Sequence, residues 1–233
     1  MNDLTLLTSL VTNPAAAINS IRERPRFVFP LVITALISAG MIYWFYSVVD
    51  FEWLKHQMFD NAPQFQKLPE AQREQAINFM SRNTLMWGGI VGVVVILGAV
   101  FSLWATYLLV AGKAAGVRFK FEQWFALACW TTLPAVVLNS IIAALMILTS
   151  SDASQLMPDS LRPLSLNELF FHRAIGQPGQ SFLAGFDLLS LWTIALTVLG
   201  VRIWSQRSLL FSCVFVLAPN ILIYGLWALV AFR

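Results

Sequence analysis

A short polar row interrupts one of the most apolar stretches of the chain. Asp187 is followed by Ser190, Thr193 and Thr197, and at 100° per residue these side chains fall within about a third of a helix circumference. A carboxylate beside hydroxyls could relay protons or bind a substrate in a transporter. The same groups could instead join helices through hydrogen bonds worth roughly 0.6 kcal/mol each. We favour this structural interpretation of the row and keep the pathway as its alternative.

Two asparagines in other apolar runs extend this polar set, and each of these runs also contains a proline. Asn139 lies beyond Pro134, and Asn220 directly follows Pro219. Each proline removes one helix hydrogen bond, so we expect a kink at both. Counting at 1.5 Å per residue places Asn139 and Asp187 at a similar depth. We therefore expect these two side chains to pair, unless the carboxylate reaches the outer water instead.

The residue types needed for catalysis are scarce. His56 and His172 are the only histidines, and each stands among ordinary surface residues. We find no HExxH, P-loop, dinucleotide-binding or Gly-x-Ser-x-Gly pattern. The two cysteines, Cys129 and Cys213, lie in apolar segments and have no metal-site spacing. We therefore expect a protein that is not an enzyme, with no catalytic residue, no metal and no cofactor.

The composition is that of a membrane protein. Apolar residues make up 58% of the 233 positions and charged residues only 12%, against about 25% charged in soluble domains. The net charge of +3 comes from basic residues at the ends of apolar runs rather than in one patch, which argues against nucleic-acid binding.

Five apolar runs are long enough to cross a bilayer, so the predicted fold is an all-α polytopic membrane protein forming a single membrane domain over residues 1–233. We expect residues 1–26 on the cytoplasmic surface, with the apolar positions of 4–21 lying against the membrane; the alternative is a partly ordered tail. Residues 50–85 form one outer loop, in which Pro69 and Glu70 open a helix, and residues 149–181 form another, with a capping box from Ser165 to Glu168. The expected spans are residues 27–49, 86–111, 125–148, 182–204 and 209–232.

Small side chains form a stripe along the second span. Their spacing places them on one face of the helix, where another helix could approach closely. We therefore predict that this stripe packs against a neighbouring span. Its members are Gly88, Gly92, Ala99, Ser102 and Thr106.

The density of lysine and arginine sets the expected orientation. Basic residues cluster at 22–26, 113–120 and 202–207, and such clusters favour the cytoplasmic side. The N-terminus is therefore predicted inside and the C-terminus outside.

The second and third spans resemble the fourth and fifth. Gly116-Val117-Arg118 recurs as Gly200-Val201-Arg202, and in each copy a cysteine follows eleven residues after the arginine, at Cys129 and Cys213. We interpret this as a parallel repeat of a helical hairpin about an axis along the membrane normal, against the alternative of shared membrane composition.

The order of these features resembles the bacterial branch of the Yip family, the Ypt/Rab-interacting polytopic membrane proteins. The resemblance rests on Asn13-Pro14, on the segment from Ile18 to Pro25, on the Gly-Val-Arg loop before a helix with Leu-Pro in its middle, and on the Trp-rich helix that turns into the last span. It implies a five-helix bundle without known catalytic residues. Eukaryotic relatives act in vesicle traffic through small GTPases, but their Asp-Leu-Tyr-Gly-Pro motif is absent here, so no GTPase partner is carried over.

Together these features predict a non-catalytic integral protein of a bacterial inner membrane that organises, adapts or shapes the bilayer. The alternative is a small oligomeric transporter or channel with a polar pathway near Asp187. The expected partners are the lipid bilayer and either a second copy or another membrane protein, with no nucleic acid.

Overall fold

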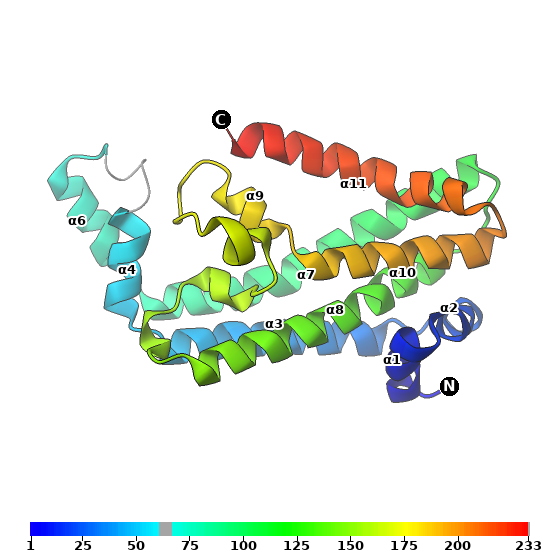
Figure 1. Ribbon diagram of the computed structural model, residues 1–233, viewed down its shortest axis with the longest axis horizontal. Coiled ribbons are helices and arrows are strands. Elements are labelled where there is room, and N and C mark those ends of the chain that lie inside the picture. The colour runs from blue at the N-terminus through cyan, green and yellow to red at the C-terminus, as the bar shows by residue number, and fades with distance from the viewer. Residues whose placement is uncertain (61–66, 233) are drawn as a thin grey trace. The chain divides into compact units, whose positions relative to one another are not determined.

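The computed structural model describes residues 1–60 and 67–232. Helices dominate this part of the chain, and its only β pairing is an isolated antiparallel bridge between Ser165 and Asp187. Figure 1 shows the helices in chain order. They are α1 (Asp3–Thr12), α2 (Pro14–Glu23), α3 (Val28–Val48), α4 (Phe51–Asp60), α6 (Glu70–Phe79), α7 (Arg82–Ala114), α8 (Phe121–Thr149), α9 (Gln180–Gly185), α10 (Leu188–Ser205) and α11 (Leu209–Ala231), with the short turns η1 (Ala153–Gln155), η2 (Pro158–Leu161) and η3 (Asn167–Phe171).

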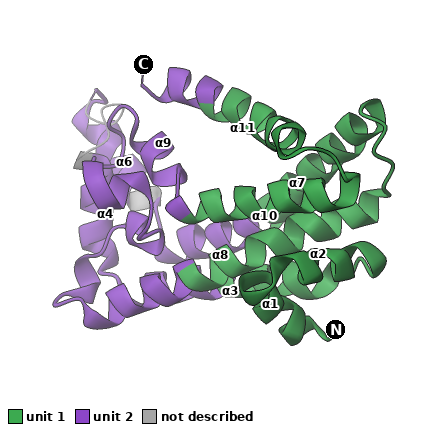
Figure 2. Ribbon diagram, turned by 45° about the vertical axis from the view of Figure 1, so that its right-hand side comes forward, with its two compact units in different colours: residues 1–37, 94–138, 189–224 green, residues 38–93, 139–188, 225–233 purple. Residues whose placement is uncertain are grey.

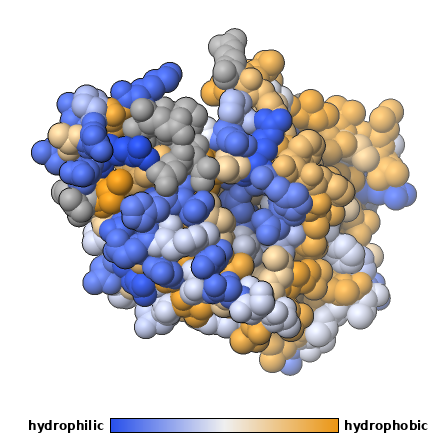
Figure 3. All heavy atoms as spheres, turned by 60° about the vertical axis from the view of Figure 1, so that its left-hand side comes forward, coloured by the Kyte–Doolittle hydropathy of each residue, from blue (hydrophilic) through white to orange (hydrophobic). Residues whose placement is uncertain are grey.

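Five of these helices, α3, α7, α8, α10 and α11, are long and apolar enough to cross a membrane. They contain 21, 33, 29, 18 and 23 residues, and about 20 residues suffice to cross the hydrocarbon core. Large apolar side chains on them remain exposed, for example Val95 and Leu103 on α7, and Figure 3 shows broad areas of hydrophobic surface. The predicted all-α, five-span membrane fold is confirmed.

The fourth span begins later than predicted. Residues 182–185 belong to the separate helix α9, and α10 starts at Leu188. Between the two helices, Leu166 donates its backbone N–H to Phe186 O, and Leu188 donates to Leu164 O. These bonds hold residues 186 and 187 in an extended bridge with residues 164–166. Asp187 therefore precedes the span instead of lying inside it, and our placement of this carboxylate within the fourth span was wrong.

Figure 2 shows the two compact units into which the chain divides. Unit 1 comprises residues 1–37, 94–138 and 189–224, and unit 2 comprises residues 38–93, 139–188 and 225–233. The core of unit 1 is built around the fully buried side chains of Trp124, Leu127 and Trp130 from α8.

Helices α1 and α2 pack against each other as an N-terminal hairpin within unit 1. Asn13 forms the corner: its N–H donates to Ser9 O at the end of α1, and its side chain accepts from Ala16 N at the start of α2. Pro14 occupies the first helical position, where no N–H is needed. The Asn13-Pro14 pair thus separates two helices, as its interruption of the apolar pattern indicated.

The apolar side of this hairpin faces protein rather than lipid. Five of its side chains are buried in the core of unit 1, so the prediction that they lie against the membrane was wrong: Leu6, Leu10, Ala17, Ile18 and Ile21. Leu4 and Val11 are the large apolar side chains of the hairpin that are exposed, at 67% and 55%.

Unit 2 is organised by a smaller cluster around Phe45, Phe51 and Leu54, to which Leu156 and Leu161 from the segment after α8 contribute. The predicted helix at Pro69-Glu70 is present as α6, with Pro69 as its N-cap. Half of the predicted capping box also forms, because Glu168 N donates to Ser165 Oγ at 3.2 Å.

Candidate functional site: the N-terminal hairpin and its tryptophan lock

The threonine hydroxyls of the predicted polar row form hydrogen bonds with carbonyl groups of their own helix. Thr197 Oγ1 donates to Thr193 O at 2.8 Å, and Thr193 Oγ1 lies 3.5 Å from Leu189 O. Thr197 also approaches the Thr131 hydroxyl of α8 at 3.3 Å, which links two spans within unit 1. Ser190 is half-buried in the first turn of α10. The structural interpretation of the row stays a prediction.

Asn139 and Asp187 do not form the expected side-chain pair. Asn139 Nδ2 donates to Leu161 O at 2.9 Å, and its Oδ1 is buried without a hydrogen-bond partner among the described residues. Asp187 instead pairs through its backbone with Ser165. The reason is that α10 begins only at Leu188, so Asp187 belongs to the connection that precedes this helix. Asn220 Nδ2 donates within its own helix, to Val216 O at 2.7 Å.

The small-residue stripe on α7 is not the packing face that we predicted. A side chain added at Gly88 or Gly92 would meet nothing within 4 Å, and Ala99 and Thr106 are exposed while Ser102 is half-buried. A different row of α7, which includes Phe101, Ala105 and Leu108, is buried in unit 1. Larger side chains bury more apolar area, so they decide which face of the helix turns inward. Pro134 and Pro219 lie inside continuous helices, and the kinks there stay predictions.

A polar cluster occupies residues 159–180 of unit 2. Asp159 Oδ2 accepts hydrogen bonds from Asn167 Nδ2 at 2.7 Å and from Gln180 Nε2 at 2.9 Å. Burial, and secondly the Asp159 carboxylate, raise the pKa of Glu168, while His172 lowers it. Within the described part of the chain no group of three His, Cys, Asp or Glu side chains could hold a metal ion. The cluster cross-links the loop and shows no arrangement of nucleophile and base.

The most distinctive polar contacts hold the N-terminal hairpin, and sequence reasoning missed them. Trp130 of α8 donates its indole N–H to Arg26 O at 2.6 Å, and Trp204 of α10 donates to Ile18 O at 3.1 Å. Gln123 Nε2 donates to Arg22 O at 2.9 Å. We call these three donors the tryptophan lock. Each reaches a backbone carbonyl of α2 or of the linker to α3.

The chemistry of the lock follows from unsatisfied groups. A buried indole usually finds a partner for its N–H, and Trp130 and Trp204 are 0% and 4% exposed. The last carbonyls of a helix have no partner inside it, and Arg22 stands in the final turn of α2. Gln123 is itself oriented because its Oε1 accepts from Lys120 N at 2.9 Å, as in a capping box. The only sequence signal was the presence of tryptophans near the basic ends of the spans.

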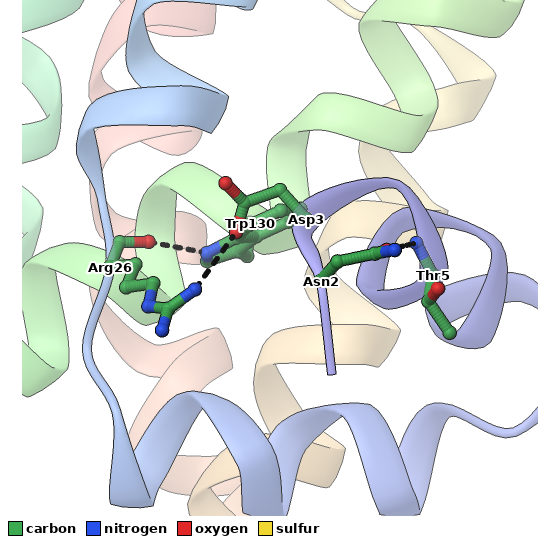
Figure 4. Close-up of polar contacts among 5 residues, drawn as sticks. All are labelled: Asn2, Asp3, Thr5, Arg26 and Trp130. Atoms are coloured by element: carbon green, nitrogen blue, oxygen red, sulfur yellow. Dashed lines mark hydrogen bonds and ion pairs between the residues drawn. The ribbon is translucent and has the colours of Figure 1, made fainter.

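A charged pair lies beside the lock (Figure 4), and its two residues also line a groove. Asn2 caps α1 by accepting from Thr5 N at 2.7 Å, which places Asp3 in the first turn of the helix. Asp3 Oδ1 lies 3.9 Å from Arg26 Nη1. The groove between them measures about 500 Å³ and is lined mainly by apolar atoms of Asp3, Pro25, Arg26, Phe27, Val28, Phe29, Val32 and Ile33.

Comparison with known proteins identifies the family. The Yip1 domain model matches residues 8–232, which covers the hairpin from Thr8 onward, the lock and all five spans. No curated protein and no solved structure gives a significant match to the chain. The five apolar helices and this match over almost the full length lead to one conclusion: the chain belongs to the Yip1-domain family of membrane proteins.

Proposed function

We propose that this protein is a non-catalytic integral membrane protein that organises, adapts or shapes the bilayer, and that the α1–α2 hairpin is the element that does so. The observation that carries the proposal is the tryptophan lock, which fixes an amphipathic helix pair to the end of the membrane spans. A fixed hairpin can transmit force between the lipid surface and the spans, whereas a loose tail cannot.

The surface that the hairpin presents supports this function. Leu4 and Val11 are exposed on α1, and an α-helix brings residues seven apart close to the same face. Arg24 and Arg26 are exposed just before α3. Exposed apolar groups beside basic ones favour binding at the boundary of an anionic bilayer.

We further propose that residues 1–233 act as one membrane domain in a bacterial inner membrane, with the N-terminus in the cytoplasm and the C-terminus outside. The basic clusters at 22–26, 113–120 and 202–207 support this orientation. A transporter has less support, because Thr193, Thr197 and Asn220 bond to carbonyls of their own helices.

Reconstituted proteoliposomes test the proposal. We expect electron cryomicroscopy to show a different vesicle diameter distribution with the protein than without it. Combined Leu4→Glu and Val11→Glu should return this distribution toward that of protein-free vesicles, because charge at these positions opposes insertion. Combined Thr5→Glu and Thr12→Glu is the matched control, since it adds the same charge to α1 at exposed polar positions and should leave the vesicle shape unchanged.

A flux screen with proton and metal indicators addresses the alternative. We expect no flux above that of protein-free vesicles. A flux that disappears in Asp187→Asn while thermal stability is retained would overturn the proposal in favour of a transporter.

A further inference from the structure

We propose that the groove beside Asp3 and Arg26 is a binding site for a phospholipid with an ethanolamine headgroup. This inference deepens the proposed function, because it names a ligand for the same N-terminal element. It rests on three features of residues 3–33: the apolar lining, the position at the start of a span, and the sign and spacing of the two charges.

The lining and the position of the groove suit a lipid chain. Val28, Phe29, Val32 and Ile33 belong to the first turns of α3, and the candidate span itself begins at Val28. Val28 and Val32 are 63% and 46% exposed, so the open side of the groove continues into the lipid-facing surface of the helix. A volume of about 500 Å³ lies within the usual range for small-molecule sites. An acyl chain is the apolar group that is always present there.

The charges at the rim suit a zwitterion. Among the described residues, Arg26 and Asp3 are the only charged ones that line the groove, and their opposite charges match those of a phosphate and an ammonium group. A guanidinium binds phosphate oxygens through paired N–H donors, and a carboxylate accepts from an ammonium. At 3.9 Å, Arg26 and Asp3 are too far apart for a direct hydrogen bond. Their donors and acceptors therefore remain available for a headgroup.

The backbone of each charged residue is fixed by a hydrogen bond away from the groove, so the two side chains start from defined positions. Arg26 is fixed through its backbone, because its carbonyl accepts the Trp130 indole N–H. Asp3 is fixed by the start of α1, which Asn2 caps. The side chains of Arg26 and Asp3 are still 54% and 32% exposed, so a ligand can reach them. Arg26→Gln and Asp3→Asn, which are proposed below, leave Trp130 and Asn2 in place to hold the backbone.

Native mass spectrometry of the detergent-purified full chain tests this site with three lipids of identical acyl chains: phosphatidylethanolamine, phosphatidylglycerol and phosphatidylcholine. We expect phosphatidylethanolamine to bind about tenfold more tightly than the other two, because only its headgroup offers Asp3 both a positive charge and hydrogen-bond donors: choline has no donor, and glycerol has hydroxyl donors but no charge. Arg26→Gln should weaken all three lipids about tenfold. Asp3→Asn should lower phosphatidylethanolamine to the level of phosphatidylcholine.

Two control variants separate the site from general effects. Arg24→Gln removes an exposed arginine outside the groove and should leave binding unchanged. Val32→Trp fills the groove and should abolish binding, whereas Leu36→Trp, one turn further along the exposed face of α3 and 63% exposed, should not. Thermal unfolding of each variant reports whether it is folded.

Three results would overturn the site. They are equal binding of the three lipids by the wild type, equal losses in Arg24→Gln and Arg26→Gln, and soluble phosphoethanolamine binding as tightly as the lipid. Because binding is measured in detergent, it is independent of vesicle shape. Specific binding without a change of vesicle shape would contradict the proposed function alone, and the reverse result would contradict this inference alone.

Discussion

Trp204 in the last turn of α10 donates its indole N–H to Ile18 O at 3.1 Å, across 186 positions of the chain. The ring also packs 5.1 Å from Trp124 and 5.2 Å from Phe119, measured between ring centroids. A single side chain therefore joins α2 to the junction of α8 and α10 within unit 1. Of the three donors of the tryptophan lock, it is the one that spans the greatest sequence separation.

Trp204→Phe should loosen the hairpin without unfolding the spans. The substitution keeps an aromatic ring and removes the hydrogen bond, so we expect a loss of about 0.5–1.5 kcal/mol in the free energy of unfolding. Trypsin should then cut faster after Arg22, whereas the bond after Arg24 is protected by Pro25. Trp192→Phe is the control, since Trp192 lies on the same helix and is 45% exposed. Equal proteolysis of the two variants would refute a role of the Trp204 hydrogen bond.

The spans and the hairpin corner could be predicted because they depend on local sequence. Length and the absence of charge are sufficient to identify an apolar run that crosses a bilayer. Asn13 and Pro14 both favour the start of a helix over the continuation of one. The same reasoning located α6 at Glu70, directly after Pro69.

The site could not be predicted because it depends on contacts between distant residues. Trp130 and Arg26 are separated by 104 positions, and no local pattern indicates that an indole will reach that carbonyl. The position of Asp187 depends on its bridge to Ser165 in the preceding loop. The face of α7 that turns inward is set by the burial of Phe101 and Leu108 in the core of unit 1. This burial outweighs the preference of Gly88 and Gly92 for close packing.

Glu168 should make the stability of the protein depend on pH. Burial and the Asp159 carboxylate raise its pKa above the ordinary value of 4.5 in the folded state, partly offset by His172. The folded state therefore holds the proton more tightly than the unfolded state, so stability falls as the pH rises from 4.5 through the raised value. Glu168→Gln mimics the protonated form, and its unfolding temperature should exceed that of the wild type at pH 7 and equal it at pH 4.

The control for this prediction is Glu74→Gln. Glu74 is exposed on α6, so its substitution removes the same charge without relieving a buried carboxylate. We expect its unfolding temperature to follow the wild type at both pH values. A constant difference between Glu168→Gln and the wild type from pH 4 to pH 7 would contradict the assignment to Glu168.

Reporter fusions test the proposed orientation. A reporter that functions only in the cytoplasm should be active when it is joined after Arg26. A reporter that functions only outside should be active when it is joined after Arg233, because five spans place the two ends on opposite sides. The basic clusters predict which end is inside. Finding both ends on the same side would contradict an odd number of spans.

Gly200 and Gly116 occupy equivalent positions in the two Gly-Val-Arg copies but have different roles. Gly116 follows α7 with φ of +77°, a conformation that favours glycine. Gly200 lies inside α10, where an added Cβ would come 2.8 Å from Leu127 Cδ1. The two motifs therefore differ in local structure, and the proposed repeat of hairpins stays a prediction.

Gly200→Ala tests the close approach of α10 to α8. Leu127 is fully buried, so it cannot move away easily, and we expect overpacking to lower the free energy of unfolding by about 1–3 kcal/mol. Gly92→Ala on α7 is the matched control, because its new methyl group would meet no atom within 4 Å and alanine favours a helix by up to about 1 kcal/mol. Thermal unfolding in detergent should therefore show a lower midpoint for Gly200→Ala and an equal or higher one for Gly92→Ala. If both variants unfolded at the wild-type temperature, α10 and α8 would not be in the tight contact that the Gly200–Leu127 distance indicates.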